Sequence, residues 1–171
     1  MEISITNNIG KTNSENIDIT VDSEELINPK YSIVEFTSKN KLRPELTVKF
    51  SLNGEDEDVD DFNFVYFESK NLIFYRFLYQ WGIIDWKLKK LKRSIFSGII
   101  DFPFFYLHKN CFLIVDDLFA ETVDFNGNKI DHIPNEQPHE IKEYEDYFEF
   151  DIIGVEKRML RKITTGNNVY N

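Results

Sequence analysis

The sequence predicts an α+β protein in which a mostly antiparallel sheet is joined by two or three helices. Several short segments alternate apolar with polar residues, which is typical of strands that bury one face. Other stretches place apolar residues at the spacing of a helix face. Alanine, the strongest helix former, occurs once among the 171 residues, which disfavours a helical bundle. A chain of this length can bury most of its apolar surface around one core, so we expect a single domain over residues 1–171.

Strands are predicted where the alternation is clearest. The segments concerned are residues 17–21, 46–50, 62–66 and 148–152. Their half-apolar pattern favours antiparallel sheet, in which one face can remain solvated.

Two hairpins are also predicted. Residues 102–107 and 111–115 are apolar runs separated by three polar residues, which indicates two buried strands joined by a short loop. Residues 123–125 and 129–130 flank the pair Asn126 and Gly127, and Asn-Gly favours a type I′ turn.

Helices are predicted in three places. Within residues 84–96, apolar residues recur at spacings of four, three and four, and the basic residues of segment 87–93 fill the remaining circumference, so we expect a basic amphipathic helix packed on the sheet. Residues 69–80 are apolar nearly all round and could form a helix, with a strand as the alternative because the segment is rich in Phe and Tyr. Residues 155–163 place basic side chains near a helical C-terminus, where the helix dipole favours them.

Charge limits the partners of this chain. The net charge of −10 favours basic proteins and repels nucleic acid and anionic membranes. The charge is uneven, since residues 1–70 carry −8, residues 71–109 carry +5 and residues 110–171 carry −7. The basic middle could pair with the acidic ends inside one fold or could have a function of its own.

The expected location is the cytoplasm. The first residues lack the basic leader and continuous apolar stretch of a signal peptide, and no apolar stretch is long enough to span a bilayer. The single cysteine, Cys111, lies in an apolar run and cannot form an internal disulfide, which fits a reducing compartment.

No catalytic motif stands out, so we expect a non-enzymatic protein with no cofactor and no bound metal. Glycines are scattered singly instead of forming a phosphate-binding loop, and the acidic segments lack the spacing of a calcium loop. A metal-dependent hydrolase is the alternative, with a site assembled from carboxylates and imidazoles that are remote in sequence. Its candidate residues are Asp116, Asp117, His132 and His139.

Two acidic segments are the candidate partner-binding sites. The first is a loop of nearly continuous acids, and the second mixes acids with tyrosines, a combination suited to an interface. The residues concerned are Asp56, Glu57, Asp58, Asp60, Asp61, Glu140, Glu143, Tyr144, Asp146 and Tyr147.

In size, charge and general character, though in no residue motif, the chain resembles the immunity proteins that neutralise bacterial nuclease toxins. The resemblance implies that an acidic surface occludes the basic active site of a toxin. A phage-type DNA mimic, which occupies a DNA-binding protein, is the alternative within the binding class.

Overall fold

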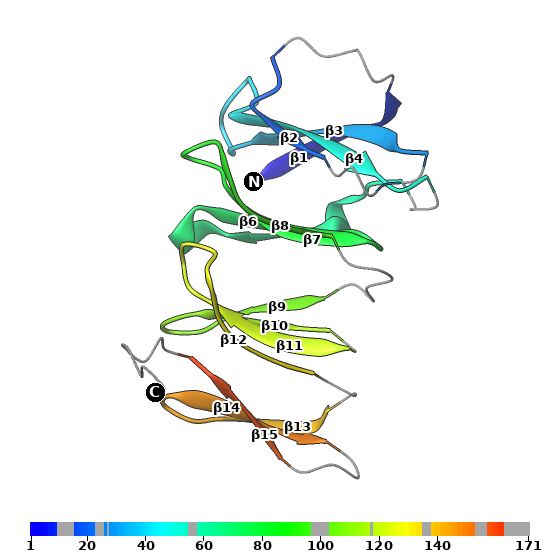
Figure 1. Ribbon diagram of the computed structural model, residues 1–171. Helices are drawn as coiled ribbons and strands as arrows, with labels where there is room; N and C mark the ends of the chain where they lie inside the picture. Colours follow the sequence, from blue (N-terminus) through cyan, green and yellow to red (C-terminus); the bar gives the residue numbers. More distant parts are fainter. Residues whose placement is uncertain are drawn as a thin grey trace, which may run out of the picture. The chain divides into compact units, whose positions relative to one another are not determined.

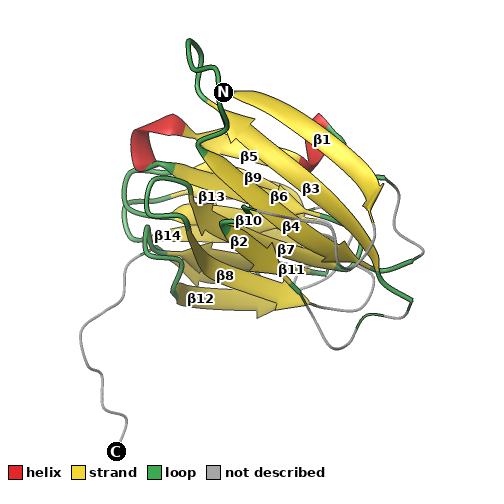
Figure 2. Cartoon of the chain, turned by 90° about the horizontal axis from the view of Figure 1, so that it is seen from above, coloured by secondary structure: helices red, strands yellow, loops and turns green. Residues whose placement is uncertain are grey.

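The computed structural model describes residues 1–9, 16–22, 26, 28–54, 58–96, 103–116, 118–134, 138–152 and 157–162. The chain divides into two compact units, Met1–Phe102 and Pro103–Asn171, each built from two sheets. Fifteen strands and two short 3-10 helices make up the regular structure of the described residues (Figure 2). The expectation that the whole chain forms one domain stays a prediction.

The first unit consists of two four-stranded sheets that lie as successive layers (Figure 1). One sheet has the order β1-β3-β4-β2, and only β2 and β4 pair in parallel. The other is a meander in the order β5-β6-β7-β8. Two 3-10 helices of this unit precede and follow β5, namely η1 (Asp61–Asn63) and η2 (Glu68–Lys70). The strands are β1 (Glu2–Ile9), β2 (Ile19–Val21), β3 (Lys30–Thr37), β4 (Leu46–Leu52), β5 (Phe64–Phe67), β6 (Leu72–Arg76), β7 (Gln80–Asp85) and β8 (Lys90–Phe96).

The core of the first unit lies between these two sheets. Alternate residues of β3 and β4 point toward it, as the period of two requires. Phe50 of β4 is fully buried and packs edge-on against Tyr75 of β6, with ring centroids 5.0 Å apart, and Phe36 packs in the same way on Phe64 at 5.4 Å. Aromatic rings therefore supply much of the apolar area that holds the two layers together.

The second unit pairs a four-stranded sheet with a three-stranded one (Figure 1). The larger sheet has the order β12-β11-β10-β9 and the smaller has the order β13-β14-β15, all antiparallel. Leu113 and Ala120 of the larger sheet pack on Phe148, Phe150 and Leu160 of the smaller. The strands are β9 (Phe104–Leu107), β10 (Phe112–Val115), β11 (Phe119–Val123), β12 (Lys129–Pro134), β13 (Pro138–Glu143), β14 (Tyr147–Ile152) and β15 (Arg158–Arg161).

The predicted α+β class is wrong, because the described residues form a nearly all-β structure whose only helical segments are η1 and η2. Residues 69–80 instead contain most of η2, all of β6 and the first residue of β7, so strand, the alternative interpretation, holds for half of this segment. Residues 158–161 of the predicted last helix form β15, which pairs with β14. Part of that predicted helix, 155–156 and 163, lies outside the described residues.

The predicted basic helix over residues 84–96 is also wrong. Its apolar residues are shared between β7, a turn at 86–89 and β8, and Leu88 in the turn is largely exposed. Lys89 adopts a positive φ of 51° in this turn, and the Asp85 carboxylate accepts a hydrogen bond from the backbone N–H of Leu88 at 2.9 Å. These features close a hairpin, so the helical spacing was coincidental.

Several sequence-based expectations are confirmed. The alternating segments 46–50 and 148–152 lie in β4 and β14, and residues 104–107 and 112–115 form the expected hairpin. A hairpin also forms around Gly127, but its turn is not type I′, since Gly127 has a positive φ of 87° while Asn126 does not. Among the described residues no helix has the length and apolar character needed to cross a membrane.

Candidate functional site

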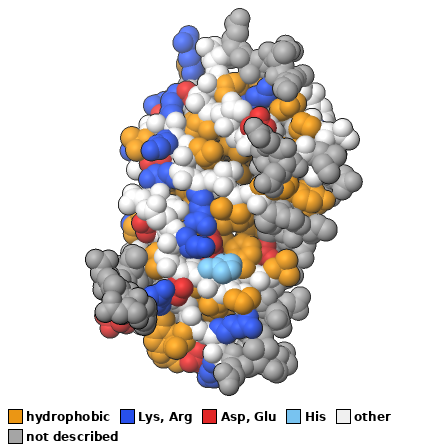
Figure 3. All heavy atoms as spheres, in the orientation of Figure 1, with side chains coloured by type: hydrophobic (Ala, Val, Ile, Leu, Met, Phe, Trp, Pro, Cys, Tyr) orange, Lys and Arg blue, Asp and Glu red, His pale blue; other side chains and the backbone are white. Residues whose placement is uncertain are grey.

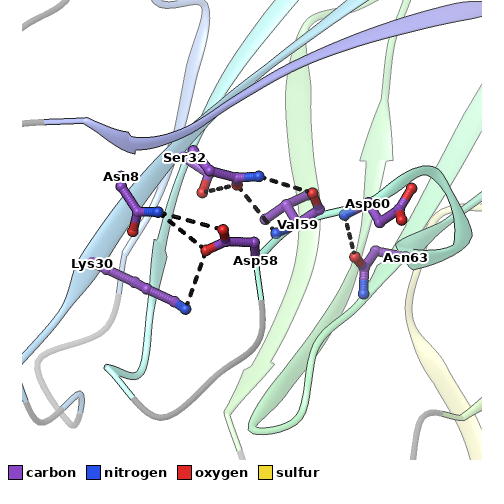
Figure 4. A network of polar contacts seen from close by, with 8 residues as sticks. Asn8, Lys30, Ser32, Asp58, Val59, Asp60 and Asn63 are labelled. Carbon is purple, nitrogen blue, oxygen red and sulfur yellow. Dashed lines mark hydrogen bonds and ion pairs between the residues drawn. The ribbon is translucent and has the colours of Figure 1, made fainter.

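The acidic loop before β5 is tied to the first sheet. The Asp58 carboxylate accepts a hydrogen bond from Asn8 Nδ2 at 3.2 Å and lies 3.5 Å from Lys30 Nζ (Figure 4). Beside it, Asn7 holds the Val59 backbone by donating to its carbonyl at 3.0 Å and accepting from its N–H at 3.1 Å. The predicted partner-binding residue Asp58 therefore also has a structural role.

The remaining acids of this loop differ in role. The Asp60 side chain caps η1 and forms a capping box with Asn63 (Figure 4). Asp61 is exposed and, within the described part of the chain, makes no side-chain hydrogen bond or ion pair. Asp56 and Glu57 lie outside the described residues. Of the predicted set in this loop, Asp61 is thus the acid most available to a partner.

The second acidic segment forms the hairpin between β13 and β14. Glu140 pairs with Lys142 at 3.1 Å, and Asp146 is exposed at the end of the hairpin. The Tyr144 and Tyr147 rings stack with centroids 4.6 Å apart, and 42% of Tyr144 remains exposed. We call residues 144–146 the hairpin tip.

Glu143 is engaged inside the second unit. Its carboxylate lies 2.5 Å from Lys162 Nζ and 3.1 Å from His108 Nδ1. The hydrogen bond from Lys162, helped by the charge of His108, lowers the pKa of Glu143 below its usual range. Lys162 is buried, donates also to the Tyr144 carbonyl at 2.6 Å, and places its ammonium 4.4 Å from the centroid of the Phe148 ring. Glu143 therefore neutralises a buried cation.

These contacts show how the two sheets of the second unit are aligned. His108 directly follows β9, and its ring packs on Phe148 of β14 at 4.6 Å. At the opposite edge, the Arg161 guanidinium of β15 lies 3.0 Å from Asp131 of β12. Strand β9 and strand β13 are thus the outer strands on the same side of the sandwich.

Apolar side chains are exposed along that side. Phe104 and Tyr106 pair in register with Val115 and Leu113, which face the core, so they project from the same face of the larger sheet. Ile141 pairs with Phe150 and likewise projects toward the space between the sheets.

Because these three residues sit at the edge, they are 59%, 48% and 40% exposed, respectively. We call Phe104, Tyr106 and Ile141 the open margin. The sequence predicted residues 102–107 as a buried strand, and that expectation is wrong for Phe104 and Tyr106. Pro103 directly precedes β9, and proline is typical of edge strands and of strand starts, so it is the one sequence signal that pointed to the edge position of this strand.

Acids lie close to the open margin along the chain. Glu140 directly precedes Ile141, Glu143 follows it after Lys142, and the hairpin tip adds Glu145 and Asp146. On the face drawn in Figure 3, however, the coloured Asp and Glu side chains lie singly among Lys, Arg and apolar side chains. On that face the acids therefore form no continuous acidic surface, and the candidate surface itself is an apolar margin whose acids are its neighbours along the chain.

The alternative hydrolase site is not assembled by the described residues. Asp116 is buried and accepts a hydrogen bond from the Leu118 backbone N–H at 2.9 Å, whereas His132 is exposed and stacks on Phe119. Asp117 and the His139 side chain lie outside the described residues. Within the described ranges, no group of three or more His, Cys, Asp or Glu side chains could hold a metal ion.

Comparison with known proteins gives no functional information. No protein-family model and no curated protein matches the sequence.

Proposed function

We propose that this chain is a non-enzymatic binding protein whose second unit docks a basic protein and occludes that protein's functional site. The immunity proteins that block nuclease-type toxins are the class we favour, and we place the protein in the cytoplasm. The observation that carries the proposal is the open margin, where Phe104, Tyr106 and Ile141 face the inter-sheet space yet remain 40–59% exposed.

Exposed aromatic residues on a rigid sheet suit protein recognition. Tyrosine and phenylalanine bury a large area on binding and lose little conformational freedom, so they are frequent at the energetic centre of interfaces. The neighbouring hairpin tip adds Tyr144, already held in place by stacking on Tyr147. A partner that inserts one apolar side chain between β9 and β13 would cover these rings.

Charge supports a basic partner. Residues 103–171 contain thirteen Asp and Glu against seven Lys and Arg, a net charge of −6. Glu145 and Asp146 are exposed and have no ion-pair partner among the described residues. Such a surface accelerates encounter with a cationic protein, including a nuclease whose cleft must bind phosphate.

The proposal is tested with affinity capture from the native host, using three baits in parallel. The first is the wild-type chain, and the second carries Phe104→Ser, Tyr106→Ser and Ile141→Ser. The third carries Met159→Ser as the matched control, because Met159 is also in the second unit and 62% exposed but pairs in register with Glu149, outside the core. Since 1.4 kcal/mol corresponds to tenfold and a central aromatic anchor contributes roughly 2 kcal/mol, the margin variant should lose about 30-fold or more in affinity.

The expected result is a basic protein captured by the wild-type and Met159→Ser baits and lost from the margin variant. Circular dichroism and thermal melting establish that the margin variant is folded. Capture that is equal for all three baits, or a captured protein that is acidic, would contradict the proposal. Identification of the captured protein as a nuclease or as another DNA-binding protein separates an immunity protein from a DNA mimic.

A further inference from the structure

We propose that the first unit carries a second, independent binding site, for a small ligand that combines a planar aromatic ring with an anionic group. The site is a hollow of about 500 Å³ formed where loops from both sheets meet. That volume lies within the range of pockets that bind cofactors and metabolites. The lining residues are Met1, Ser38, Lys39, Tyr66, Glu68, Asn71, Trp86 and Lys87.

One wall of the hollow is aromatic. Tyr66 of β5 and Trp86, which follows β7, meet edge-to-face with ring centroids 6.1 Å apart. The Trp86 backbone N–H donates to the Asn71 carbonyl at 3.1 Å, which ties the turn after β7 to the end of η2. Burial, together with Glu68 and Glu45, raises the pKa of Tyr66, so its phenol is neutral at physiological pH. A neutral, fixed aromatic wall is suited to stacking with a planar ring.

Two lysines give the hollow its charge. Lys39 and Lys87 are exposed, and neither makes an ion pair with any residue that the structure describes. Other lysines of the same unit differ in this respect, since Lys41 pairs with Glu45 and Lys89 pairs with Asp18 at 2.8 Å. Lys87 places its ammonium 5.8 Å from the centroid of the Trp86 ring, so the lining presents two cations without a carboxylate partner against one carboxylate, Glu68. This balance favours a ligand with a single anionic group.

Polar groups can orient the ring. The Asn71 side chain makes no hydrogen bond within the described part of the chain, and Asn71 holds a positive φ of 56° at the end of η2. Its amide can both donate and accept, as the edge of a nitrogen heterocycle requires. A nucleoside monophosphate and an aromatic carboxylate share the chemistry that this hollow recognises, and the experiment distinguishes them.

Isothermal titration calorimetry with the full chain tests the site. The two ring-bearing anions are adenosine 5′-monophosphate and 2-naphthoate. Adenosine, which lacks the anionic group, and inorganic phosphate, which lacks the ring, are the partial probes. We expect saturable binding of at least one ring-bearing anion, with affinity at least tenfold above that of the two partial probes and weakened by added salt. The anion that binds more tightly shows whether the hollow takes a nucleoside monophosphate or an aromatic carboxylate.

Variants locate the binding. Lys39→Ala with Lys87→Ala should weaken binding of the ring-bearing anion about tenfold, because two charge-assisted contacts are lost. Lys90→Ala is the matched control, since Lys90 is also exposed but lies outside the lining, and it should leave the affinity unchanged. Three results would overturn the proposal. They are no binding of either anion up to about 1 mM, binding of adenosine or phosphate as tight as that of the ring-bearing anion, and a loss of affinity in the Lys90→Ala control as large as in the Lys39→Ala, Lys87→Ala variant.

Discussion

Replacing Gly82 with alanine is expected to destabilise the first unit strongly, because no space exists for the added methyl group. Gly82 lies in β7, in register with Tyr75 of β6 and Ser94 of β8. A Cβ at this position would lie 2.3 Å from the Arg93 carbonyl oxygen and 2.4 Å from the Tyr75 hydroxyl oxygen. The Tyr75 ring therefore occupies the place that a side chain would take.

Neither neighbour can move cheaply. The Arg93 oxygen belongs to the backbone of β8, and Tyr75 is fully buried with its hydroxyl donating to Ser94 Oγ at 2.9 Å. Overpacking of this kind costs roughly 3 kcal/mol, at the upper end of the usual range. For a unit of this size that corresponds to a fall in Tm of about 12 to 24 °C.

Thermal melting of Gly82→Ala, followed by circular dichroism, is the assay. Tyr75→Phe serves as the companion variant, since it removes one contact atom and one hydrogen bond and should cost about 1 kcal/mol in the wild-type background. In the Gly82→Ala background its cost should be smaller, because it also relieves part of the overlap. A Gly82→Ala protein that melts within about 2 °C of wild type would refute the strand pairing of β6, β7 and β8.

Three further outcomes are expected. Asn7→Ala should cost about 2 to 3 kcal/mol in chemical denaturation, since it removes both hydrogen bonds to Val59, whereas the exposed Thr6→Ala on the same strand should change stability by less than about 0.5 kcal/mol. The folded-state pKa of Glu143 is lowered from 4.5, so the stability that Glu143 contributes is complete above pH 4.5 and is lost as the pH falls through the lower folded-state pKa. Glu143→Gln should therefore flatten the loss of stability below pH 4.5. An acid-denaturation profile that is the same for the variant and the wild type would contradict the pairing of Glu143 with Lys162. Burial raises the pKa of Cys111 to about 11, so a thiol reagent at pH 8 should label the native protein at least about 100-fold more slowly than the denatured protein, and fast native labelling would show that Cys111 is accessible.

Strands with one solvated face could be predicted from the sequence. In β14 the buried Phe148 and Phe150 alternate with the more exposed Tyr147 and Glu149, and this period of two is visible without a structure. In β6, by contrast, residues 72–75 are all buried, so the strand reads as a continuous apolar run. Such a run fits a buried helix equally well, and only the length of the run and its content of aromatic residues favour a strand.

The helix prediction for residues 84–96 was wrong for a different reason. Ile84, Leu91 and Ile95 fall at helical spacings because a four-residue turn separates two strands, and that insertion shifts the apolar positions into apparent helical phase. The signal that was missed is the β propensity of Ile84, Trp86 and Ile95. Of the alternatives left open for the basic middle, an ion pair with an acidic end of the chain is observed for Lys89, which pairs with Asp18, whereas Lys92 lies 3.7 Å from Asp85 within the basic stretch itself.

The candidate surface was only partly accessible to sequence reasoning. Acids and tyrosines of residues 140–147 were chosen on composition, and the structure places Tyr144 and Asp146 at an exposed hairpin. The role of Glu143 could not be foreseen, because its partners His108 and Lys162 are remote in sequence. The open margin depends on strand order, which no single segment encodes.

Photo-crosslinking in the native host tests the proposed docking surface most directly. A benzophenone amino acid is placed at Tyr106 on the open margin and, as the comparison, at Met159, which lies outside both the core and the margin. We expect the probe at position 106 to capture a basic protein and the probe at position 159 to capture none. Crosslinking to that protein from position 159 alone, or from neither position although the unmodified chain captures it, would contradict the account.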